Sequence, residues 1–89
     1  MQIENMNNID WNETAKRILK AELVKRGITN EMLAGLLNNF GFDETKQSVE
    51  SKIYRGTFSA AFLFQCLTVM NCKTLNTEID ISKPTKRKK

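Results

Sequence analysis

Histidine is absent from this 89-residue chain, and proline and tryptophan each occur once. Without histidine, the chain lacks the side chain that most often acts as a general base and is the commonest metal ligand. The sequence also contains no serine-centred nucleophile turn, no glycine-rich phosphate loop and no run of metal-ligating residues. We therefore expect a protein that is not an enzyme, has no metal or other cofactor and offers no evident small-molecule site.

Long apolar runs are also missing. The longest, AAFLF, lies within residues 60–67 and is far shorter than the roughly 20 residues that a membrane-spanning helix needs. The segment MQIENMNNID has no basic stretch followed by an apolar one, so we expect no signal peptide. Cys66 and Cys72 match no metal or redox spacing, and a disulfide between them would not fit helical geometry. These features predict a cytoplasmic protein with reduced thiols and no membrane contact.

The net charge of +4 is unevenly distributed. Residues 1–82 contain nine basic and ten acidic side chains, whereas the remaining seven positions contain five basic residues and no acidic ones. The sequence therefore predicts a flexible N-terminus at residues 1–10, one domain at residues 11–81 and a disordered basic tail at residues 82–89. Such a tail is either a solvated end or an arm that lies along phosphates.

Apolar residues recur at helical spacing in four segments, and a capping residue or a glycine marks most of their ends. The N-terminal caps are expected at Asp10, Thr29, Ser59 and either Asp43 or Thr45. Glycines follow the first three segments, where a left-handed residue ends a helix at little cost: Gly27, Gly41 and Gly56. These signals predict an all-α fold, in which residues 73–81 form either a short fifth helix or an extended segment.

The apolar stripes predict which side chains form the core. The second segment has one such stripe at the i, i+3, i+4, i+7 spacing: Leu33, Leu36, Leu37 and Phe40. Trp11 is expected to fill the core from the first segment. Val49 and Ile53 are the buried pair of the third segment, about residues 45–55, where the other positions are mostly polar. Gly35 lies within the second helix at a cost of up to about 1 kcal/mol, so we expect a neighbouring helix to pack closely against it.

The stretches KRGITNEMLAGLLNNFG and KQSVESKIYRG, followed by an apolar helix, resemble the helix-turn-helix domain of phage repressors and their bacterial relatives. The matching positions are Gly27, Ile28, Thr29, Leu33, Ala34, Arg55 and Gly56. More narrowly, AKRILKAELVKRGIT with KIYRGTFSAAFLFQCL is similar to a set of small bacterial proteins known only as a domain of unknown function. The resemblance extends over about Trp11–Leu75.

The resemblance implies a compact lambda-repressor-like helix-turn-helix fold of four to five helices. It also implies sequence-specific binding of double-stranded DNA by a small bacterial or phage transcriptional regulator. The expected base contacts lie on the polar face of the third helix: Lys46, Gln47, Glu50 and Ser51. The expected contacts with the DNA backbone are Thr29, Asn30, Lys52, Tyr54, Arg55, Lys86, Arg87 and Lys88.

Such a regulator is expected to bind two half-sites as a homodimer. The apolar fourth helix supplies the candidate interface residues Phe62, Phe64 and Val69. Two features depart from the family pattern: the turn before the third helix is longer, and the buried pair of that helix is spaced by four instead of three. Together with Glu50 and the near-neutral body, they keep a second interpretation open. In it, the chain is a helical protein–protein interaction module, an adaptor or a subunit, that retains the scaffold without reading DNA.

Overall fold

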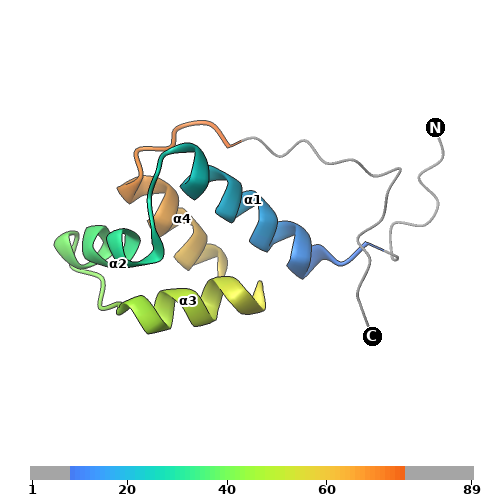
Figure 1. The fold of residues 1–89 in the computed structure, drawn as a ribbon, viewed down its shortest axis with the longest axis horizontal. Coiled ribbons are helices and arrows are strands. Elements are labelled where there is room, and N and C mark those ends of the chain that lie inside the picture. The colour runs from blue at the N-terminus through green and yellow to red at the C-terminus, as the bar shows by residue number, and fades with distance from the viewer. Residues whose placement is uncertain (1–8, 76–89) are drawn as a thin grey trace.

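Four helices form the part of the chain that the computed structural model describes, residues 9–75 (Figure 1). They are α1 (Trp11–Lys25), α2 (Asn30–Asn39), α3 (Lys46–Arg55) and α4 (Ala60–Val69). No strand occurs in these residues, so the predicted all-α fold is confirmed. The predicted basic tail and most of the predicted flexible N-terminus and fifth helix lie outside the described residues.

Each helix begins at one of the predicted capping residues. The Asp10 carboxylate accepts a hydrogen bond from the backbone N–H of Glu13 at 3.1 Å, and the Ser59 hydroxyl accepts one from Phe62 at 3.0 Å. Of the two candidates before α3, Thr45 is the cap, and its backbone N–H donates to the Ser48 hydroxyl at 2.8 Å in return. These caps fix where the chain enters each helix because they satisfy otherwise unpaired backbone donors.

The end of α3 is locked against the start of α1. Gly56 has φ +69°, the left-handed conformation that favours glycine. A Cβ atom at this position would lie 2.3 Å from the backbone oxygen of Asn12. Glycine is therefore required here both for the turn and for the close approach of α1 to α3.

The core fills the space between the helices, and α3 packs against both α1 and α2 while α2 also packs against α4. Its centre consists of side chains with no exposed surface: Leu19, Leu33, Leu37, Val49 and Cys66. Burial raises the pKa of the Cys66 thiol to about 12, with a further contribution from the negative charge of Glu44. Cys66 is therefore a protonated core residue, and both it and Cys72 are free thiols, as predicted.

Three predictions about the core are wrong. Trp11 is 46% exposed and Phe40 is 57% exposed, so neither fills the core. Both stand at a helix boundary. There an apolar residue can follow the helical spacing of the core residues and still lie beyond the neighbouring helices that would cover it. Outside the adjoining backbone of α2, no described atom lies within 4 Å of the place where a Cβ of Gly35 would stand, so no described helix packs against this glycine.

Candidate nucleic-acid interface

The exposed face of α3 is the surface on which the sequence places base recognition. Val49 and Ile53 are buried, as predicted, and this orients α3 with Gln47, Tyr54 and Arg55 toward solvent. Tyr54 is 76% exposed, a high value for an aromatic side chain. The structure therefore presents a polar helix face with one large exposed ring.

Two pairs of side chains on this face are joined within α3 itself. The Lys46 ammonium lies 3.7 Å from the Glu50 carboxylate, and the Arg55 guanidinium donates to the Ser51 hydroxyl at 2.7 Å. Pairs of this kind on an exposed helix contribute only about 0.3–0.5 kcal/mol. They can therefore be exchanged for contacts with a ligand at small cost. Gln47 has no hydrogen-bond partner in the described part of the chain.

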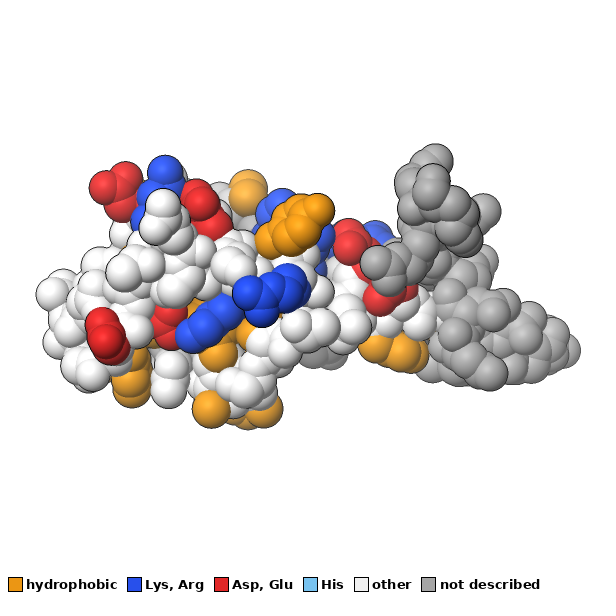
Figure 2. Space-filling view, turned by 90° about the horizontal axis from the view of Figure 1, so that it is seen from below, with side chains coloured by type: hydrophobic (Ala, Val, Ile, Leu, Met, Phe, Trp, Pro, Cys, Tyr) orange, Lys and Arg blue, Asp and Glu red, His pale blue; other side chains and the backbone are white. Residues whose placement is uncertain are grey.

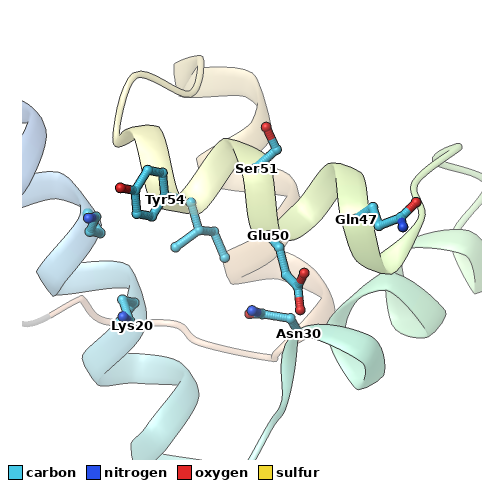
Figure 3. Close-up of a pocket in the computed structure, with 8 residues that line it drawn as sticks. Lys20, Asn30, Gln47, Glu50, Ser51 and Tyr54 are labelled. Atoms are coloured by element: carbon cyan, nitrogen blue, oxygen red, sulfur yellow. The ribbon is translucent and has the colours of Figure 1, made fainter.

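Beside this face, α1 and α3 border an open groove of about 490 Å³, which we call the α1–α3 groove (Figure 3). Its lining residues come from three helices: Lys16, Lys20, Asn30, Gln47, Glu50, Ser51, Ile53 and Tyr54. Lys20 lies on the α1 wall, and Glu50 extends from α3 toward Asn30. At one end the Lys16 ammonium lies 4.7 Å from the centre of the Tyr54 ring, a cation–π contact.

The α3 side of the molecule carries charges of both signs. Figure 2, which shows the molecule from that side, has blue and red side chains among white and orange ones, and its largest blue area is two adjoining side chains near the centre. Between residues 9 and 75 the chain has nine basic and seven acidic side chains. This surface alone would steer DNA weakly, because non-specific attraction scales with the number of phosphates neutralised.

Lys52 and Glu44 form a separate cluster on the other flank of α3. The Lys52 ammonium lies 2.6 Å from the buried Glu44 carboxylate and 4.9 Å from the centre of the Phe62 ring. Burial acts to raise the pKa of Glu44, but hydrogen bonds from Lys52 and Ser48 and the charge of Lys52 outweigh it, so the pKa lies below its ordinary value. Lys52, a predicted backbone contact, is thus already paired within the chain, although its side chain is 41% exposed.

The loop before α3 is held by Asn38. Residues 40–45 connect α2 and α3, a longer link than the roughly three or four residues of a typical helix-turn-helix. The Asn38 side chain donates to the backbone oxygen of Glu44 at 2.8 Å and accepts from its backbone N–H at 3.1 Å. The extra length therefore does not leave α3 loosely attached.

The remaining predicted site residues lie in different parts of the molecule. The Thr29 hydroxyl accepts from the backbone N–H of Met32 as the cap of α2, while Asn30 lines the groove. Lys86, Arg87 and Lys88 lie outside the described residues. Of the predicted dimer residues, Phe62 is 4% exposed and Val69 is 8% exposed, so both belong to the core of the single chain, and only Phe64, at 64%, is accessible.

Lys16 and Lys20 are groove residues that sequence reasoning did not assign to the site. Both stand on α1, a helix for which the sequence predicted no site residue. Tertiary packing decides which helix lies beside the polar face of α3. The one sequence feature related to that packing is Gly56, the glycine that permits the contact between α1 and α3.

One comparison with known proteins gives a match. The model of a family described as Domain of unknown function (DUF6471) matches residues 11–75, which comprise all four helices. No curated protein and no solved structure matches the chain significantly. No helix among the described residues has both the length and the apolar character to cross a membrane.

Proposed function

The chain belongs to the DUF6471 family, and we propose that it is a sequence-specific double-stranded DNA-binding protein. It acts as a small bacterial or phage transcriptional regulator in the cytoplasm and uses α2 and α3 as a lambda-repressor-like helix-turn-helix. The observation that carries the proposal is the exposed polar face of α3, where Gln47, Tyr54 and Arg55 stand free of the core while Val49 and Ile53 anchor the helix.

The chemistry of this face suits reading of a major groove. Gln47 can form two hydrogen bonds with adenine, and Glu50 can accept one from cytosine. Arg55, at the far end of α3, is placed for a phosphate, which any sequence offers. The basic tail at residues 82–89 adds up to five further phosphate contacts and supplies the attraction that the mixed-charge body lacks.

The test is selection of bound sequences from a random pool of duplexes, followed by anisotropy titrations with the selected duplex. Gln47→Ala is expected to change the preferred base at one position and to weaken binding by about 1–3 kcal/mol. Arg55→Ala is expected to weaken binding to all duplexes to a similar degree and to reduce its salt dependence. If selection enriches no sequence, or if Gln47→Ala changes neither affinity nor preference, α3 does not read bases.

A second candidate function is supported by a different surface. Residues 57–71 contain no charged side chain, and Phe64 in their middle is 64% exposed on α4. A protein–protein interaction module would use such a face and would need no DNA. This function is favoured if the wild-type protein shows no salt-sensitive DNA binding but still associates with another protein through Phe64.

A further inference from the structure

The α1–α3 groove contains one cation, Lys20, that forms no ion pair with any side chain the structure describes. Lys46 is paired with Glu50, Lys52 with Glu44, and both Lys25 and Arg26 with Glu22. Lys20 has no ion pair with any described residue, although it stands on the wall of a concave surface. The Asn30 carboxamide lines the same groove and likewise has no hydrogen-bond partner in the described region. The groove thus offers one free positive charge and one free amide donor.

The charges around the groove define the anion that it can accept. Glu50 lies in the groove, and its charge is offset by Lys46 at 3.7 Å, while Lys16 lies 3.6 Å from Glu13 and over the Tyr54 ring. What remains is close to a single positive charge. A group with one negative charge fits this balance, whereas a second negative charge would find no cation left to compensate it in the groove. A phosphodiester group carries one negative charge and several acceptor oxygens.

We propose that the α1–α3 groove seats one phosphodiester group of the bound duplex, with the Lys20 ammonium as its ionic contact and the Asn30 amide as its hydrogen-bond donor. This inference rests on the proposed function and adds to it a third helix, α1, that contacts DNA. The groove lies directly beside Gln47 and Glu50, so a backbone held there would run alongside the bases that α3 reads (Figure 3). Lys20 would then fix the position of α3 along the duplex.

The decisive experiment compares Lys20→Gln with Lys73→Gln in the full-length chain. Lys73 is an exposed lysine without an ion pair among the described residues, and it lies outside the groove, so both variants lose the same charge. Binding to a fluorescein-labelled 30-base-pair duplex is measured by anisotropy over a series of NaCl concentrations. Lys20→Gln is expected to reduce the slope of log K against log salt by about 0.9, the value for one phosphate contact. Lys73→Gln is expected to leave the slope unchanged.

Further arms separate the possible failures. Lys20→Arg keeps the charge and is expected to retain the wild-type slope, and circular dichroism checks that each variant is folded. If wild-type protein binds DNA but Lys20→Gln has the wild-type slope, or if both glutamine variants lower it equally, the groove is not a phosphate site. If wild-type protein binds no duplex at low salt, the proposed function itself fails.

A last arm distinguishes the duplex backbone from free phosphate. The side-chain amide signals of Asn30 are followed by NMR during titration with the duplex and, separately, with sodium phosphate at constant ionic strength. The duplex is expected to shift these signals, and Lys20→Gln is expected to reduce the shift. A shift that saturates with inorganic phosphate and is absent with the duplex would overturn the assignment to a phosphodiester.

Discussion

At the scale of single residues, Gly27 and Gly56 form a natural comparison. Both end a helix with nearly the same backbone angle, φ +66° and φ +69°. A Cβ at Gly27 would meet no atom within 4 Å, whereas one at Gly56 would lie 2.3 Å from the backbone oxygen of Asn12. A side chain at either site therefore has the same conformational cost, but only a side chain at Gly56 also has a steric cost.

We predict that Gly27→Ala lowers the free energy of unfolding by about 1–2 kcal/mol, the cost of a left-handed alanine. Gly56→Ala should cost clearly more, because the backbone of α1 or α3 must also move. Urea denaturation followed by circular dichroism measures both values. Equal losses in the two variants would contradict the close contact between the end of α3 and the start of α1.

At the scale of helices and loops, the entry into α3 depends on a buried carboxylate. Glu44 is 7% exposed and accepts hydrogen bonds from Lys52 and Ser48, both at 2.6 Å. Because its pKa is lower in the folded protein than its ordinary value, the ionised form stabilises the fold. This contribution is complete above the pKa of the unfolded chain and is lost as the pH falls through the folded pKa.

We predict that Glu44→Gln lowers the free energy of unfolding at pH 7 by about 1.5–3 kcal/mol, the range for a hydrogen bond to a charged group. The difference from wild type should shrink as the pH is lowered below about 4.5, the ordinary value for Glu. Glu50→Gln is the matched control, since its side chain is 45% exposed and its pair with Lys46 is a surface contact. Its effect should stay below about 1 kcal/mol. A loss for Glu44→Gln that is independent of pH would show that shape, and not charge, matters there.

Local sequence signals predicted the elements well because they act within a few residues. Helix boundaries depend on hydrogen bonds and backbone angles set by residues close in the sequence: the caps Asp10, Thr29 and Ser59, and the helix-ending Gly56. Exposure was predicted less well. Whether Phe40 is covered depends on where another helix ends, and this information is spread over the whole chain.

The same division applies to the candidate site. The spacing of Val49 and Ile53 was enough to predict the exposed face of α3. The ion pair of Lys52 with Glu44 was not predicted, because the two residues are eight apart and meet only through the bend of the loop. The role of Lys20 depends on the packing of α1 against α3, for which the sequence contains no periodic signal.

At the scale of the whole molecule, the distribution of charge separates two surfaces. The α3 side carries charges of both signs, whereas α4 and its flanking residues 57–71 carry none. The exposed positions of α4 include Ala60, Ala61, Phe64 and Thr68. An uncharged face produces no like-charge repulsion with a second copy of itself, which suits the homodimer that the family resemblance predicts. Of the three residues that the sequence offered for the interface, Phe64 alone remains accessible to make this contact.

We predict that wild-type protein sediments at about twice the chain mass of 10.2 kDa and that Phe64→Glu sediments as a monomer. The variant should keep its helical content because Phe64 is not part of the core. Val24→Glu on α1, where the native side chain is 78% exposed, is the control and should leave the mass unchanged. On DNA, Phe64→Glu should lose affinity for a duplex with two half-sites one helical turn apart and bind a single half-site as well as wild type. A wild-type monomer that binds both duplexes equally would rule out the predicted dimer and leave a single chain acting on DNA.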